Sequence, residues 1–213
     1  MLSDWIDAPL STGTLAAFMA QGAEDLQGFL DEIHAQLITA PVAHFDETGA
    51  RVQGRLRWLF CASTGRATYY SLHDKRGFDG LDHAGVLPHF TGTAVHDGFK
   101  PYRRYTAAVH ALCKRGVIKQ TFARNLIMRL DRDREQVLRF AHDFRVPFDN
   151  NLAERDLRMI KLQQKISGSW RTITGAEIFL ALRSYLSTTR KNNHPTVDAI
   201  TALAAHAPWL PAT

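Results

Sequence analysis

Two aspartates follow apolar runs that the sequence predicts as strands. Asp46 closes the first run, in the segment HFDETG, and Asp97 closes another, in AVHDGF. If these strands are neighbours, both carboxylates emerge at the same edge of a sheet, where open α/β sheets bind ligands. Carboxylates so close repel each other unless a cation joins them, and hard oxygen ligands favour Mg²⁺ or Mn²⁺ over zinc. Two such ions, roughly 3.5–4 Å apart, can activate a nucleophile and stabilise a leaving oxygen in phosphoryl transfer.

A third carboxylate, Glu154, lies in the segment VPFDNNLAERDLR at residues 146–158. A helix that begins after an Asn150 N-cap would bury its apolar side on the sheet and point Glu154 at the two aspartates. The alternative is an ion pair between Glu154 and Arg158, one turn apart on a solvated face, and spacing leaves both open. The polar stripe of this helix contains Asn151, Glu154, Arg155, Arg158, Lys161 and Lys165. Its apolar side contains Ala153, Leu157, Ile160 and Gln164, with Leu152, Met159 and Ile166 beside it.

The elements that must position these acids alternate between strands and helices. Period-two patterns and turn residues predict strands at 42–49, 54–63, 66–74, 91–99 and 109–113. Helical spacing predicts helices at 12–38, 76–87, 118–143, 150–166, 175–192 and 195–206, with breaks at Pro147, Gly168, Gly175 and Pro195. This order favours a ribonuclease H-like mixed α/β sheet flanked by helices, with a helical C-terminal part. We expect an N-terminal helical segment at 1–40 and the main domain at 41–213.

Charge is divided unevenly along the 213 residues. Residues 1–50 contain eight acids and no Lys or Arg, whereas residues 51–213 carry all 26 Lys and Arg against 13 acids. A basic body of this kind favours a polyanionic partner, most simply nucleic acid, although a solvated basic surface is the plain alternative.

Both cysteines, Cys61 and Cys113, lie in apolar runs without the spacing of a metal site, so we expect buried free thiols in a reducing compartment. The sequence shows no signal peptide and no apolar run of membrane-spanning length. We therefore expect a cytoplasmic, nucleoid-associated bacterial protein without a membrane partner.

Three stretches of the sequence are similar to one known family. APVAHFDETGARV, VHDGFKPYRRYT and VPFDNNLAERDLRMIKLQQKISGSWRT closely resemble the insertion-sequence-sixty-six family of bacterial DDE transposases. The last stretch is long and specific, and the resemblance covers nearly the whole chain. The segment HDKRG at 73–77 resembles the family's HPKRG motif, with Asp74 in place of the proline.

The resemblance implies a ribonuclease H-like domain that acts on DNA ends with two Mg²⁺ or Mn²⁺ ions. It assigns the catalytic and metal-binding triad to Asp46, Asp97 and Glu154. It implies strand cleavage by activated water, followed by attack of the freed 3′-hydroxyl on target DNA. It further suggests a homo-oligomer and accessory proteins of the same element. Residues near the acids, or in the matched motif, that we expect to contact DNA are Lys75, Arg76, Lys100, Asn151, Arg155, Arg158, Lys161, Lys165 and Arg171.

The chain also departs from the family pattern. It begins just before the catalytic domain, and Asp97 and Glu154 are only 57 residues apart, closer than is usual in the family. We therefore expect an N-terminally truncated, internally deleted copy. Besides an active transposase, this leaves a catalytically inactive remnant that binds DNA or the full-length transposase, and a ribonuclease H-like nuclease acting on other nucleic acid.

Overall fold

The computed structural model describes residues 11–97, 99–105, 127–128 and 130–212. The strand predicted at 109–113, Cys113 and part of the helix predicted at 118–143 lie outside these residues. Of the two cysteines, Cys61 is a buried free thiol, as expected. No helix in the described part of the chain is long and apolar enough to cross a membrane.

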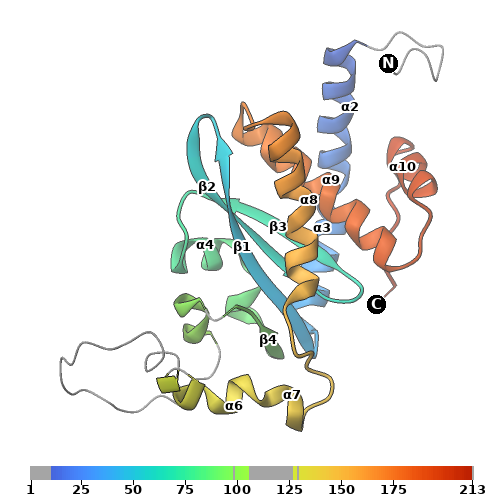
Figure 1. Cartoon of the computed structure of the whole chain (residues 1–213). Coiled ribbons are helices and arrows are strands. Elements are labelled where there is room, and N and C mark those ends of the chain that lie inside the picture. Colours follow the sequence, from blue (N-terminus) through green and yellow to red (C-terminus); the bar gives the residue numbers. More distant parts are fainter. Residues whose placement is uncertain (1–10, 98, 106–126, 129, 213) are drawn as a thin grey trace.

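A four-stranded mixed sheet forms the centre of the molecule (Figure 1). Its strands are β1 (Val42–Val52), β2 (Arg55–Ser63), β3 (Thr68–His73) and β4 (Thr93–Val95). They lie in the order β3-β2-β1-β4, with β1, β2 and β3 in an antiparallel meander and β4 parallel to β1. The predicted mixed α/β fold is confirmed, and the sheet with its flanking helices is consistent with the ribonuclease H-like class.

Strand β1 is longer than the sequence predicted. It continues past Asp46 to Val52 and pairs with β2 along its length, so the expectation that Asp46 closes the strand was wrong. The reason is the turn that follows. Gln53 and Gly54 both have positive φ, 53° and 74°, which suits the tight two-residue turn of a hairpin with the native strand twist.

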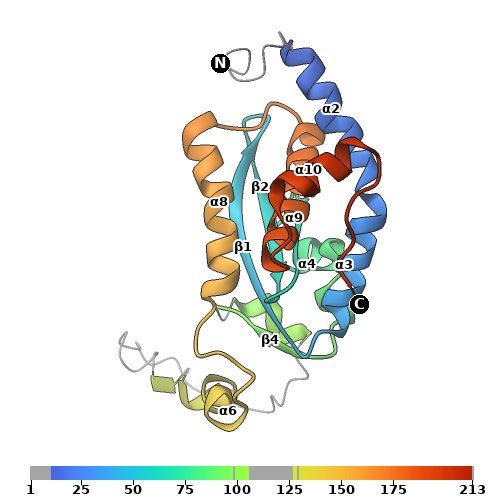
Figure 2. The same cartoon turned by 90° about the vertical axis from the view of Figure 1, so that its right-hand side faces the viewer.

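Helices cover both faces of the sheet (Figure 2). They are α2 (Thr12–Asp25), α3 (Gln27–Thr39), α4 (Phe78–Ala84), α6 (Arg134–Val137), α7 (Arg139–His142), α8 (Asn151–Ser167), α9 (Ile173–Lys191) and α10 (Thr196–Ala204). Two short 3₁₀ helices are η1 (Leu87–His89) and η2 (Lys100–Arg104). Helix α8 lies on one side of the sheet, and α3 and α4 lie on the other, so each face has its own apolar core.

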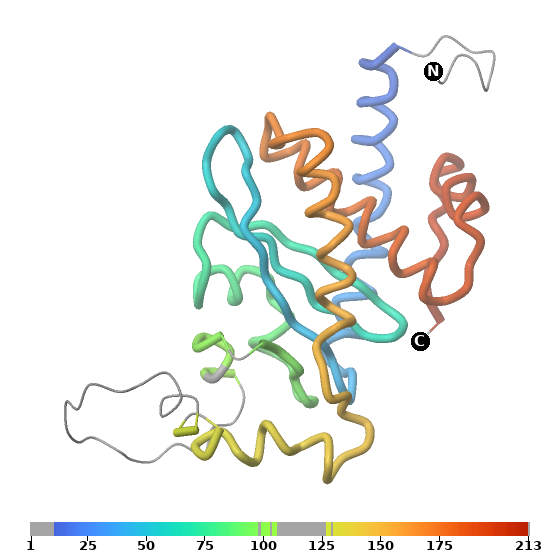
Figure 3. The backbone as a smooth tube through the Cα atoms, in the orientation of Figure 1, coloured from blue at the N-terminus to red at the C-terminus, as the bar shows by residue number. Residues whose placement is uncertain are grey.

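Two predicted helix limits were wrong for local reasons. The single helix predicted at 12–38 is interrupted at Leu26, a fully buried residue with ψ near 0°, and α2 extends away from the sheet (Figure 3). Gly175 does not break α9, because the helix begins earlier, at Ile173. The Thr172 hydroxyl caps it by accepting a 3.0 Å hydrogen bond from the Gly175 N–H.

Helix α9 covers the outer edge of β3. The N–H groups of Thr68 and Tyr70, which have no further strand to pair with, donate to the hydroxyls of Thr188 and Ser184. A sheet edge with unpaired N–H groups invites association with other chains, so this cover closes one edge of the sheet. Among the described residues, the opposite edge is β4, which is the strand that leads to Asp97.

Candidate functional site

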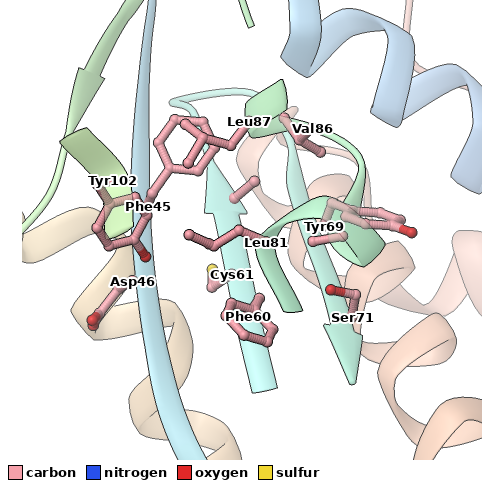
Figure 4. Close-up of a pocket in the computed structure, with 12 residues that line it drawn as sticks. Phe45, Asp46, Phe60, Cys61, Tyr69, Ser71, Leu81, Val86, Leu87 and Tyr102 are labelled. Atoms are coloured by element: carbon pink, nitrogen blue, oxygen red, sulfur yellow. The ribbon is translucent and has the colours of Figure 1, made fainter. Parts of the chain in front are cut away.

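Asp46 faces helix α8. Side chains alternate along a strand, and the neighbours of Asp46 on its own face, His44 and Ala50, contact α8 or pack in its core. The pocket shown in Figure 4 lies on the opposite face among apolar side chains. Asp46 borders that pocket, but its carboxylate is turned to the other side of β1. Asp46 is thus half-buried under α8 and close to open solvent.

The pairing of β1 with β4 places the two aspartates side by side. His44 pairs with Val95 in a parallel register, and continuing that register by two residues puts Asp97 level with Asp46. β4 itself ends at Val95, so the strand predicted at 91–99 was too long and Asp97 lies in the loop beyond it. Asp97 is exposed, and its Oδ1 accepts a 3.0 Å hydrogen bond from the Phe99 N–H.

The surroundings of Asp46 disfavour its charged form. Burial, together with the negative charges of Glu47 and Asp97, raises the pKa of Asp46 to about 6. A hydrogen bond from the Glu47 N–H and the positive charge of Lys161 oppose this rise in pKa. The carboxylate of Asp46 is therefore held where its charge is poorly compensated, which is the condition that a bound cation relieves.

Glu154 lies in the first turn of α8 and is exposed. The apolar residues predicted to face the sheet do so: Ala153, Leu157 and Ile160 are fully buried. The alternative ion pair with Arg158 is not formed. Met159 and Ile166, predicted to lie beside the apolar face, are 40% and 75% exposed, so the buried side of α8 is narrower than predicted.

Helix α8 places Glu154 on the same side as Lys161. Lys161 is seven residues after Glu154, hence on the same side of the helix, and its charge acts on Asp46. Asp156, about 200° around the helix from Glu154, points to the opposite side and accepts from Ser63 of β2. Glu154 and Asp156 therefore lie on opposite sides of α8.

The start of α8 is fixed by Asn150. Asn150 is the N-cap residue, as predicted, but its side chain does not cap the helix. Instead, its Nδ2 donates to the Phe45 carbonyl at 2.9 Å, and its Oδ1 lies 3.0 Å from His44 Nδ1. These bonds attach the end of α8 that carries Glu154 to the part of β1 that carries Asp46. Sequence reasoning missed this function of Asn150, and helix-capping rules gave no signal for it.

Most of the residues expected to contact DNA are exposed. Those on α8 that form the basic stripe are Arg155, Arg158, Lys161 and Lys165, and Arg171 follows the helix. Lys75 and Lys100 are exposed too, and Lys75 pairs with Asp79 at 2.7 Å. Asn151 bonds to Asp149. Arg76 is exposed as well, with 39% of its side chain accessible, but its guanidinium forms a 2.6 Å ion pair with Glu47, whose side chain has no exposed surface.

A buried ion pair between Asp156 and Lys191 joins α8 to α9. The Lys191 ammonium donates to Asp156 Oδ2 and to Ser63 Oγ, both at 2.7 Å, and to the Thr64 carbonyl at 2.8 Å. Burial lowers the pKa of Lys191, which the charge of Asp156 opposes. The hydroxyls of Ser63 and Thr68 also donate to Asp156. In the sequence, the one signal for this burial of Asp156 is its position beside the apolar face of the predicted helix.

The three acids are of the type that holds a divalent metal, but in the described part of the chain they are not gathered into one cluster. Within the described residues, no three His, Cys, Asp or Glu side chains stand close enough to hold a metal ion. Asp97 lies close enough to Asp46 for its charge to raise the pKa of Asp46, and Glu154 lies in the first turn of α8. Oxygen donors of this kind suit Mg²⁺ or Mn²⁺.

Comparison with known proteins identifies the family. The model of the Transposase IS66 family matches residues 1–115 and 114–178, two stretches that meet where the sequence predicts an internal deletion. No curated protein and no solved structure matched the chain. Because the family match covers most of the sequence and includes all three acids, the resemblance seen in the motifs is confirmed: the chain belongs to the Transposase IS66 family.

Proposed function

We propose that this chain is the catalytic domain of a DNA transposase that cleaves DNA strands and transfers them to a target. Asp46, Asp97 and Glu154 would hold two Mg²⁺ or Mn²⁺ ions. When bound, such ions activate the attacking water or 3′-hydroxyl and stabilise the leaving oxygen. The observation that carries the proposal is the parallel register of β1 and β4, which sets Asp97 level with an Asp46 whose pKa is raised to about 6.

The protein's own side chains would bind and align the DNA. The exposed basic stripe of α8 begins beside Glu154 and runs the length of the helix, so phosphates bound along it would lie next to the acids. Alignment matters because displacement of a reacting group by about 1 Å can cost on the order of 10²-fold in rate. The bonds from Asn150 to β1 would keep Glu154 in register with Asp46.

A second candidate is a remnant that binds DNA, or a full-length transposase, without catalysis. Two observations favour it: the family match is split into two stretches, and the three acids of the described structure are not clustered. Such a protein would bind DNA through the basic stripe of α8 and would not require Asp46, Asp97 or Glu154 for its function.

Nicking of supercoiled plasmid DNA in the presence of Mn²⁺ tests the proposal. We expect nicking by the wild-type protein and its loss in Asp46→Asn, Asp97→Asn and Glu154→Gln. Glu177→Gln, which removes an exposed acid of α9, is the matched control and should nick normally. DNA binding without nicking by the wild type would support the remnant. Nicking that survives all three substitutions would refute the assigned residues.

A further inference from the structure

Glu47 is the most completely buried carboxylate near the site, and the proposed reaction does not use it. It follows Asp46 in β1 and points to the opposite face of the sheet. Its Oε1 accepts from Nε and Nη2 of Arg76, at 3.0 and 2.6 Å, and its Oε2 accepts from the Tyr102 hydroxyl at 2.6 Å. A buried carboxylate needs such partners, because an unpaired one would be very costly. The cluster joins β1, the turn after β3, and η2.

The guanidinium of Arg76 also holds an aromatic residue of the loop after β4. It lies 4.7 Å from the ring centre of Trp58 and 4.0 Å from that of Phe99, so it is stacked between β2 and this loop. Cation–π contacts strengthen when they are withdrawn from water, and the planar guanidinium suits them better than an ammonium group. Phe99 in turn donates its N–H to Asp97 Oδ1.

These contacts hold the segment after β4, where the pairing of β4 with β1 has already ended. β4 pairs with β1 over only three residues, and its last pair, Val95 with His44, stops before Asp97. Beyond β4, the segment is held by His96, whose ring stacks on Tyr102 at 4.6 Å between ring centres, and by Phe99 and the fully buried Tyr102 at the Glu47 cluster. Asp97 therefore stands between two anchors, the β4 ladder before it and the Arg76 stack after it.

We propose that Arg76 is a positioning residue, which holds Phe99 and hence Asp97 beside Asp46 through its bonds to Glu47, and does not bind DNA phosphates. This inference deepens the proposed function and rests on it for its catalytic meaning. It replaces the sequence-based expectation that Arg76 contacts DNA, an expectation drawn from its nearness to the predicted acids. Lys75, the adjacent residue, is 72% exposed in its side chain and serves as the natural comparison.

Two variants separate positioning from phosphate binding. Arg76→Lys keeps the positive charge but loses the paired bonds to Glu47 and the planar stack. The double substitution Arg76→Met with Glu47→Gln removes both charges, so no unpaired charge is buried if the single variants fold poorly. Lys75→Ala is the matched control. Each protein is measured by hydrogen–deuterium exchange over residues 93–105, with the β2 amides as an internal reference for global folding.

If Arg76 positions this segment, the Phe99 and Tyr102 amides should exchange at least tenfold faster in Arg76→Lys, because charge-assisted hydrogen bonds are lost. The exchange rates of the β2 amides, and all rates in Lys75→Ala, should stay at their wild-type values. The positioning role also predicts that Arg76→Lys needs at least tenfold more Mn²⁺ for half of the wild-type rise in Tm. The double variant should keep the wild-type salt dependence of DNA binding.

Wild-type exchange rates in Arg76→Lys would overturn the proposal. So would a slope of log K against log salt for DNA binding that is lowered by about one in the double variant, because such a change indicates a lost phosphate contact. The proposed function fails separately. If the wild-type protein shows no Mn²⁺ response that depends on Asp46, the metal site is refuted, while the exchange rates still decide whether Arg76 holds the Asp97 segment.

Discussion

Replacing Asp46 with asparagine should stabilise the metal-free protein at pH 8. Burial and the charges of Glu47 and Asp97 raise the pKa of Asp46 from 3.8 to about 6. The folded protein therefore binds a proton at this site more tightly than the unfolded chain does. Stability from this group is fully present below pH 4 and is lost as pH rises through about 6, so at pH 8 the charged Asp46 destabilises the fold. Asparagine carries no charge and can still accept the hydrogen bond from the Glu47 N–H.

The size of the effect follows from the shift. About two pKa units correspond to roughly 2.7 kcal/mol, and because Asp46 is only half-buried we discount this to about 1–2 kcal/mol for solvent screening. In a protein of this length, 1 kcal/mol moves Tm by about 2–4 °C. We expect Asp46→Asn to melt several degrees above the wild type at pH 8 in EDTA, and the two proteins to melt together near pH 4.

Thermal melts from pH 4 to pH 8, in EDTA, check this prediction. Glu177→Gln is the control for loss of an ordinary exposed acid, and its difference from the wild type should stay within about 0.5 kcal/mol at every pH. A wild type that is as stable as Asp46→Asn at pH 8, or an advantage of the variant that does not shrink toward pH 4, would refute the reasoning. Either result would mean that Asp46 is not strained by its neighbours.

Two further predictions concern the α8 helix. Lys191→Met should lower the free energy of unfolding by about 3–5 kcal/mol in chemical denaturation, because it leaves Asp156 buried without its partner. Adding Asp156→Asn should recover part of this loss. Equal stability of Lys191→Met and the wild type would show that the ion pair does not stabilise the fold. Lys161→Ala should lower the slope of log K against log salt for DNA binding by about one. Arg66→Ala, on the exposed β2–β3 turn, is the control and should leave the slope unchanged. An unchanged slope in Lys161→Ala would show that Lys161 of α8 does not contact DNA phosphates.

Local patterns in the sequence were enough for the sheet and for the helix that carries Glu154. Alternation in β3, and the apolar spacing of Ala153, Leu157 and Ile160, reflect burial against one layer, which periodicity reports directly. The register of β4 could not be read this way, because a three-residue strand has too few side chains to show a period.

The polar anchors of the site could not be predicted, because each joins segments far apart in the sequence. Glu47 follows Asp46 in β1, but nothing near it in the chain indicates Arg76 or Tyr102 as its partners. The same holds for Lys191, which reaches Asp156 from the end of another helix. The prediction for Arg76 was drawn from its nearness to the predicted acids, whereas its contacts depend on the tertiary fold.

Titration of the purified protein with Mn²⁺, followed by Tm, tests the central claim most directly. A ligand that binds only the folded state stabilises by about 2.7 kcal/mol at 100-fold above its dissociation constant. The account predicts a saturable rise in Tm for the wild type and for Glu177→Gln, and its loss in Asp46→Asn, Asp97→Asn and Glu154→Gln. No rise in the wild type, or the same rise in all five proteins, would contradict a metal site at these three acids.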